Sequence, residues 1–159
     1  DVETATCKGT SIHINLPNVY TIEPRQAPDS GVKNAAGKGT ILLVDDEKVI
    51  RDVTGRMLSK AGYNVIPVRS GREALDFYRN NRDEIDAVIL DLVMPEMGGE
   101  EVFHKMQDLH EPPPVLFASG YLPEDRPGLK KISTGHFIHK PFNQETLISE
   151  VEKLIRRQP

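Results

Sequence analysis

The sequence predicts an α/β fold in which five parallel strands form one doubly wound sheet. The first observation behind this prediction is that short apolar runs alternate with amphipathic helical stretches from residue 40 onwards, a pattern typical of parallel sheets with helices on both faces. The second is the run Ala87–Asp91, in which four apolar residues precede one carboxylate. A continuous apolar run of this kind indicates a strand that is buried on both faces.

The remaining elements follow from apolar periodicity and from the residues that begin and end them. Strands are expected at Ile41–Val44, Val65–Val68, Ala87–Asp91, Pro114–Ser119 and Phe137–His139. Helices are expected over residues 49–61, after the capping-box residue Ser70, from about Gly99 and after the capping residue Asn143. Because Pro123, Pro127 and Gly128 follow the fourth strand, a helix in that place is expected to be short or broken.

The first 38 residues have a different pattern. Residues 10–16 alternate apolar and polar side chains, which predicts a half-buried strand, and Pro17 ends it. No second strand follows within hairpin reach, so this strand is expected to lack a partner. An unpaired strand tends to pair with any available strand edge. Pairing with a second copy of the chain would give a homodimer through residues 10–16. Residues 17–38 are rich in proline and glycine and are expected to be a linker, which leaves residues 39–159 as the main domain.

Composition excludes several classes of function. The formal net charge is −4, which gives no basic surface for nucleic acid. Cys7 is the only cysteine, so the sequence supports neither a disulfide framework nor a cysteine-based zinc site, and a reducing, cytoplasmic location is expected. No apolar run is long enough to cross a bilayer, so direct membrane contact is not expected.

Polar residues stand at the ends of four of the predicted strands. They are Asp45 and Asp46 after the first, Asp91 at the end of the third, Ser119 at the end of the fourth and Lys140 after the fifth. Each of them alone could be a helix cap, a turn residue or a solvated charge. In a parallel sheet, however, all these strand ends lie at one edge, where open α/β sheets place their ligand chemistry. Together they predict a site.

The residue types at this edge indicate the chemistry. Three carboxylates in one place favour a small hard cation, and ligation by oxygen alone favours Mg²⁺. Zinc is not expected, because no cysteine or histidine stands at these strand ends except His139, and its side chain should point opposite to that of Lys140. A carboxylate beside Mg²⁺ and an ammonium group can attack phosphorus, so Asp91 is predicted to become an aspartyl phosphate. Lys140 would neutralise phosphoryl charge, and the Ser119 hydroxyl would bond an oxygen of the product.

At these residues the chain resembles the receiver domain of two-component response regulators. The resemblance covers residues 39–159, and its motifs are Asp45-Asp46, Asp91 with Met94-Pro95 and Gly98-Gly99, Ser119-Gly120 and Lys140-Pro141-Phe142. It implies the flavodoxin-like receiver fold and a phosphoryl group received from the phosphohistidine of a histidine kinase or a histidine phosphotransfer domain. The proline-containing segment 122–132 departs from the family pattern and leaves the usual output face in doubt.

The resemblance also implies individual roles. Asp46, Asp91 and the backbone carbonyl of Val93 would bind Mg²⁺, with Asp45 assisting through water. Lys140 would contact the phosphoryl group, and its peptide bond to Pro141 is expected to be cis. Ser119 and Phe137 would form the conformational switch, although Phe137 could equally be a core residue.

A second resemblance concerns residues 1–16. Cys7-Lys-Gly9-Thr10 and the strand after it are similar to the closing segment of the ATP-binding domain of sensor histidine kinases. We therefore expect the chain to be the C-terminal part of a hybrid histidine kinase, whose complete chain could be membrane-anchored. The 159 residues do not include the dimerisation helices, the phosphorylated histidine or the nucleotide pocket of such a kinase, so they are expected to have no kinase activity of their own.

Two other classes of function remain open at this point. A hydrolase of the haloacid-dehalogenase type also phosphorylates an aspartate at a strand end with Mg²⁺, but it would need an aspartate where Val93 stands. A flavodoxin-like cofactor binder would need a glycine- or hydroxyl-rich phosphate loop after the first strand, where Asp45 and Asp46 would repel a phosphate.

Overall fold

The structure is a computed structural model that describes residues 2–5, 9–12, 39–120 and 136–156. The chain divides into two compact units, residues 1–33 and 34–159. The first contains a short antiparallel hairpin of β1 (Val2–Ala5) and β2 (Gly9–Ile12), in which Val2 pairs with Ile12 and Ala5 with Gly9.

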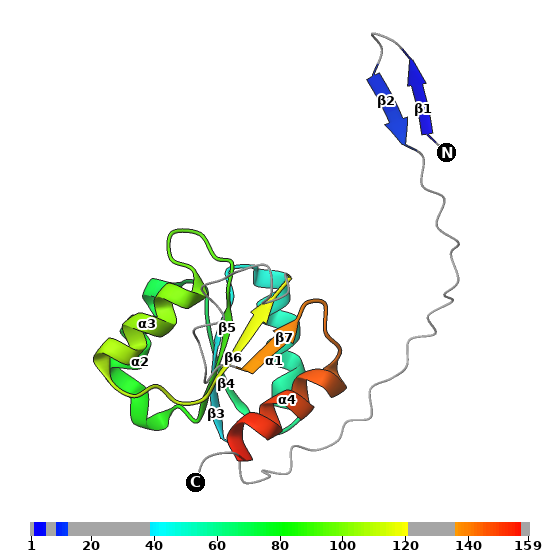
Figure 1. Cartoon of the computed structure of the whole chain (residues 1–159). Coiled ribbons are helices and arrows are strands. Elements are labelled where there is room, and N and C mark those ends of the chain that lie inside the picture. The colour runs from blue at the N-terminus through cyan, green and yellow to red at the C-terminus, as the bar shows by residue number, and fades with distance from the viewer. Residues whose placement is uncertain (1, 6–8, 13–38, 121–135, 157–159) are drawn as a thin grey trace. The chain divides into compact units, whose positions relative to one another are not determined.

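The second unit contains the predicted five-stranded parallel sheet (Figure 1). Its strands are β3 (Thr40–Val44), β4 (Asn64–Val68), β5 (Ala87–Asp91), β6 (Val115–Ser119) and β7 (His136–His139). Their order across the sheet is β4-β3-β5-β6-β7, and every neighbouring pair is parallel. All strands therefore end at the same edge, and the strand predictions are confirmed.

Helices cover both faces of the sheet, as the fold class requires. The α-helices are α1 (Lys48–Lys60), α2 (Gly71–Asn81), α3 (Gly99–Leu109) and α4 (Gln144–Arg156), and a 3₁₀ turn, η1 (Arg82–Glu84), follows α2. Figure 1 shows α2 and α3 on one side of the sheet and α1 and α4 on the other. Two hydrophobic clusters result, one under each pair of helices.

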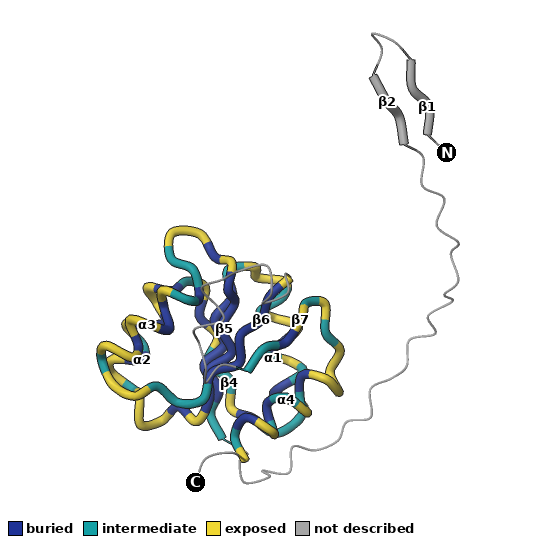
Figure 2. Tube along the Cα trace, in the orientation of Figure 1, coloured by how far each residue is buried: buried dark blue, intermediate teal, exposed yellow. Residues whose placement is uncertain are grey.

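The central position of β5 explains its composition. All five of its residues are buried, because β3 and β6 flank it and helices cover both of its faces (Figure 2). Strand β4 lies at one edge of the sheet and is largely accessible to solvent. Pro67 fits there, since an edge strand can do without one ladder hydrogen bond.

The predicted helix ends are also confirmed. The Ser70 hydroxyl accepts a hydrogen bond from the Glu73 amide at 3.2 Å, and the Asn143 side chain accepts one from the Thr146 amide at 2.8 Å. Gly62 follows α1 with a φ of 95°, a left-handed conformation that glycine adopts at little cost.

One prediction for the N-terminal region is wrong. The strand that was expected to lack a partner is paired along β2 with β1, which precedes it in the chain. Residues 2–5 contain Glu3 and Ala5, which form strands poorly, so propensity and periodicity do not predict this partner strand. Residues 13–16 of the predicted strand, the linker 17–38 and the proline-containing segment 122–132 lie outside the described residues.

Candidate functional site

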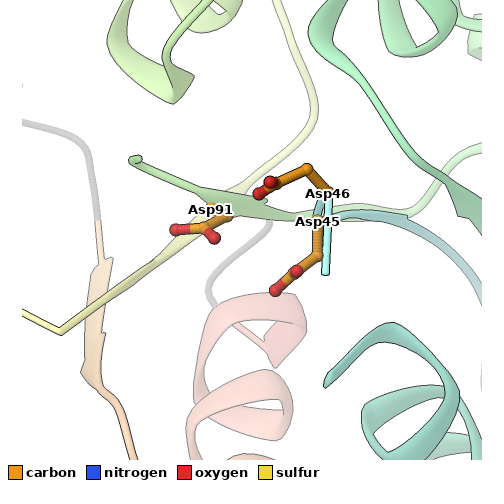
Figure 3. A group of neighbouring side chains, drawn as sticks. All are labelled: Asp45, Asp46 and Asp91. Carbon is orange, nitrogen blue, oxygen red and sulfur yellow. The ribbon is translucent and has the colours of Figure 1, made fainter. Parts of the chain in front are cut away.

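Three carboxylates meet at the carboxyl edge of the sheet. Asp45 and Asp46 follow β3, Asp91 ends β5, and one oxygen of each lies within 4.8 Å of the others (Figure 3). Asp45 and Asp91 are buried, whereas Asp46 is more accessible. The parallel pairing of β3 with β5 sets this arrangement, because it aligns the ends of the two strands.

The Lys140 ammonium joins two of these carboxylates. Its Nζ lies 2.7 Å from Asp45 Oδ2 and 2.8 Å from Asp91 Oδ2, and it donates a hydrogen bond to each. The lysine follows β7, and its backbone N–H donates to the Ser119 carbonyl at 2.7 Å. The peptide bond between Lys140 and Pro141 is cis, as predicted. Residues far apart in the sequence thus form one charged cluster.

The second oxygen of each buried carboxylate accepts a hydrogen bond from the loop that follows its strand. Asp45 Oδ1 accepts from the Glu47 amide at 2.9 Å, and Asp91 Oδ1 accepts from the Val93 amide at 3.1 Å. Each carboxylate therefore has one oxygen held by its own loop and the other by Lys140. This pattern fixes the side chains before any ligand arrives.

Burial and charge act in opposite directions on the titration of this cluster. Burial raises the pKa of Asp91, although hydrogen bonds from Lys140 and the Val93 amide partly offset the shift. Burial alone would lower the pKa of Lys140, but the bonds from its ammonium to Asp45 and Asp91 outweigh burial, so its pKa lies above the usual value. Lys140 therefore carries its positive charge at neutral pH.

The two predicted switch residues lie on neighbouring strands. Ser119 ends β6 and is buried, and Phe137 of β7 is partly buried. The Phe137 ring stacks on Phe117 with a centroid distance of 5.3 Å, and Phe117 in turn makes an edge contact with Phe103 of α3 at 5.4 Å. Phe137 is thus one end of an aromatic row that crosses from β7 to α3.

The comparisons with known proteins agree with this geometry. The model of the response regulator receiver domain matches residues 41–152, which is more than half of the chain. The chain belongs to the response regulator receiver family. The match includes every residue of the predicted site, and a receiver of two-component systems accounts for both the sheet order and the acidic edge.

Similar proteins include a sensor kinase and a response regulator. The sensor kinase CckA of Brucella abortus is 32% identical over 165 residues, covering 95% of this chain and 17% of the kinase. The response regulator MprA of Mycobacterium sp. (strain KMS) is 37% identical over 119 residues, covering 74% of this chain and 50% of MprA. The chain therefore spans about a sixth to a half of the relatives that it matches.

Solved structures of receivers have the same fold. The receiver domain of the hybrid histidine kinase CckA matches with a TM-score of 0.63 and 32% identity, covering 74% of this chain and 99% of that one. The chemotaxis protein CheY4 of Vibrio cholerae matches with a TM-score of 0.65 and 33% identity, covering 73% of this chain and 98% of the other.

Sequence reasoning missed two features of the receiver site. The first is Arg51, whose Nη1 donates a hydrogen bond to the Asp45 carbonyl oxygen at 2.5 Å. The second is a groove of about 480 Å³ that runs from Asp91 and Lys140 along α1 to Phe142. The helical spacing of the apolar residues in 49–61 predicts one buried face that includes Val49 and Val53, but this prediction is wrong for both, because they are exposed to solvent by 71% and 44%. Only the packing of the fold distinguishes these positions from buried ones.

Proposed function

We propose that this receiver takes a phosphoryl group from a phosphohistidine onto the Asp91 carboxylate in a Mg²⁺-dependent reaction. An Asp91 oxygen attacks phosphorus, the P–N bond to the imidazole breaks, and an acyl phosphate forms while the freed ring nitrogen keeps the electron pair. The observation that carries the proposal is the contact of Lys140 with both Asp45 and Asp91 at the carboxyl edge of the sheet. An ammonium held there can neutralise the phosphoryl oxygens as they approach.

The donor set fits a magnesium ion. The cluster holds three carboxylates and one ammonium, so it keeps an excess of negative charge, and all of its side-chain donors to a cation are oxygens. Asp46 and Asp91 would hold the ion directly with the Val93 carbonyl, and Asp45 would assist through water. When bound, Mg²⁺ would supply charge neutralisation at the transferring phosphoryl group.

Ser119 and Phe137 are proposed as the switch that reports phosphorylation. Ser119 ends β6 beside Asp91, since β5 and β6 are paired, and its hydroxyl would bond an oxygen of the product. The row of Phe137, Phe117 and Phe103 supports a coupled movement, because a shift of one ring changes the packing of the next.

The phosphodonor is proposed to be a protein. Val53 and Val93 line the groove beside Asp91, and Val49 lies four residues before Val53 on the same helix. In the part of the chain that the structure describes, these three valines are the large hydrophobic side chains that are exposed. A histidine kinase or a histidine phosphotransfer domain would cover them while its phosphohistidine reaches Asp91.

The complete protein is proposed to be a hybrid histidine kinase, with its receiver in the cytoplasm. Similarity to the sensor kinase CckA covers 95% of this chain, which is more than residues 41–152 can account for. The similarity therefore continues into the residues that precede the receiver, and we assign residues 1–16 to the end of a kinase ATP-binding domain and 17–38 to a linker. The described residues contain no helix long and apolar enough to cross a membrane.

A homodimer through residues 10–16 stays a prediction, and the pairing of β2 with β1 weakens its support. It assumed a strand with both edges unpaired, whereas one edge of β2 is paired with β1. Dimerisation would now have to use the remaining edge of this hairpin.

Intact-mass analysis after incubation with phosphoramidate tests the proposal. The wild-type protein should gain one phosphoryl group with Mg²⁺ and none after treatment with EDTA, and Asp91→Asn should gain none. A haloacid-dehalogenase-type hydrolase would instead release phosphate continuously, and a flavodoxin-like binder would retain a flavin and gain no mass. An equal gain of mass by Asp91→Asn would exclude Asp91 as the acceptor.

A further inference from the structure

Arg51 is a charged residue next to the acidic cluster that has no place in the proposed chemistry. It is the fourth residue of α1, the helix that follows the acidic pair Asp45-Asp46. Its Nη1 donates a hydrogen bond to the carbonyl oxygen of Asp45 at 2.5 Å. It does not touch the carboxylates of the cluster through any hydrogen bond that the described residues show. Its contact is with the backbone that carries them.

This contact fixes the peptide unit between Asp45 and Asp46. The carbonyl group of Asp45 and the N and Cα atoms of Asp46 lie in one plane, so holding the oxygen sets the position and tilt of the Asp46 Cα. The side chain of Asp46 starts from that atom. A hydrogen bond from a charged guanidinium is short and strong, which makes it a firm restraint.

The first turn of α1 has few other restraints. Glu47 precedes the helix without a side-chain capping bond, and the first turn contains no acidic residue. The turn is held by the Asp45 carboxylate, which accepts from the Glu47 amide, and by the Arg51 amide, which donates to the Glu47 carbonyl at 2.9 Å. Arg51 thus holds the Asp45 carbonyl with its side chain and the Glu47 carbonyl with its amide, and these two residues lie on either side of Asp46.

We propose that Arg51 is a positioning residue for the cation site, acting on Asp46 through the Asp45 carbonyl. The inference rests on the proposed function, because it assumes that Asp46 binds the cation. Residues that orient metal ligands typically change metal affinity by about 10- to 100-fold when they are replaced. We expect Arg51→Met to weaken Mg²⁺ binding by about tenfold, the low end of that range, because Asp46 is only one of the proposed ligands.

The sign of the effect separates positioning from simple electrostatics. Removing a positive charge beside an acidic cluster would, by Coulomb's law alone, strengthen the binding of a divalent cation. Positioning predicts the opposite. Arg51→Lys keeps the charge and a donor of similar reach, so it should restore most of the affinity. Arg56→Met is the matched control, because it removes the same charge from the same helix without a contact to Asp45.

The experiment is a titration of each protein with MgCl₂, followed by the backbone amide shift of Asp46 in NMR spectra, with no phosphodonor present. Weakening by Arg51→Met with recovery in Arg51→Lys and no weakening in Arg56→Met would support the proposal. Tighter or unchanged binding by Arg51→Met would overturn it while leaving the proposed function intact. If the wild-type protein bound no Mg²⁺, both would fail.

If Arg51→Met does not fold, Arg51→Gln provides the same test. It removes the charge and shortens the donor, so it should also weaken Mg²⁺ binding. Tighter or unchanged binding by Arg51→Gln would overturn the proposal.

Discussion

The start of α3 packs directly on the backbone of Asp91, the proposed acceptor, and this contact makes Gly99 a sensitive position. A Cβ atom on Gly99 would overlap the Asp91 carbonyl oxygen and lie 3.0 Å from the Asp91 carbonyl carbon and 3.1 Å from Leu90 Cγ. Carbon atoms in good contact are about 3.5–4.0 Å apart, so α3 and β5 would have to separate by roughly 0.5–1 Å.

The Gly99→Ala variant should therefore lose stability. Overpacking of this kind costs about 1–3 kcal/mol, and the better helix propensity of alanine returns less than about 1 kcal/mol at the first position of a helix. We expect the free energy of unfolding to fall by about 1–2 kcal/mol. The rate of phosphorylation should fall by about tenfold or more, since a displacement near 1 Å can cost 10²-fold.

Gly55→Ala is the matched control. Gly55 lies inside α1, and a Cβ atom there would meet Leu43 at 3.9 Å and Val65 at 4.0 Å, which are ordinary contacts. This variant should gain about 0.5–1 kcal/mol. Urea unfolding followed by circular dichroism measures both variants. The reasoning would be refuted if Gly99→Ala were as stable as the wild-type protein, or if Gly55→Ala lost as much stability as Gly99→Ala.

Three further predictions concern the loop after Asp91, the core under α2 and the groove. Glu96 has a φ of 62°, a left-handed conformation that is strained for a residue with a side chain. Glu96→Gly should relieve this strain and raise the free energy of unfolding by about 1 kcal/mol in urea titrations. A lower free energy of unfolding would contradict this reasoning. Burial raises the pKa of Tyr78, so the unfolded chain releases this proton first and stability should fall as pH rises above about 10. In thermal melts, the melting temperature of Tyr78→Phe should fall less steeply with pH above about 10 than that of the wild-type protein. Equal slopes would contradict the assignment of this pH dependence to Tyr78. Val53→Glu should no longer receive a phosphoryl group from a phosphorylated histidine kinase but should still receive one from phosphoramidate, as measured by intact mass. Loss of both reactions would mean a folding defect instead of lost docking.

The sequence predicted the convergence of Asp45, Asp91 and Lys140 because topology alone determines it. Once strands are parallel, their ends share an edge, and no knowledge of side-chain conformation is needed. The same reasoning could not predict that Lys140 contacts both carboxylates. Those contacts depend on the rotamer of a long side chain and on the loop that begins at the end of β7.

The features that the sequence did not predict depend on reach or on weak local signals. Arg51 extends back over its own helix to the Asp45 carbonyl, and helical periodicity does not describe such a contact. Val53 has the spacing of a core residue but is 44% exposed, because it lines the open groove beside Asp91 and does not pack in the core. Strand β1 is only four residues long, and two of them, Glu3 and Ala5, form strands poorly.

The central claim is that Asp91 becomes the acyl phosphate, and mapping the modified residue tests it most directly. Borohydride reduces an acyl phosphate of aspartate to homoserine, so a phosphorylated and reduced sample can be digested and sequenced by mass spectrometry. We predict homoserine at position 91 in samples treated with phosphoramidate and Mg²⁺, and aspartate at that position when EDTA replaces Mg²⁺. Homoserine at position 45 or 46, or a phosphoryl group that borohydride does not remove, would contradict the account.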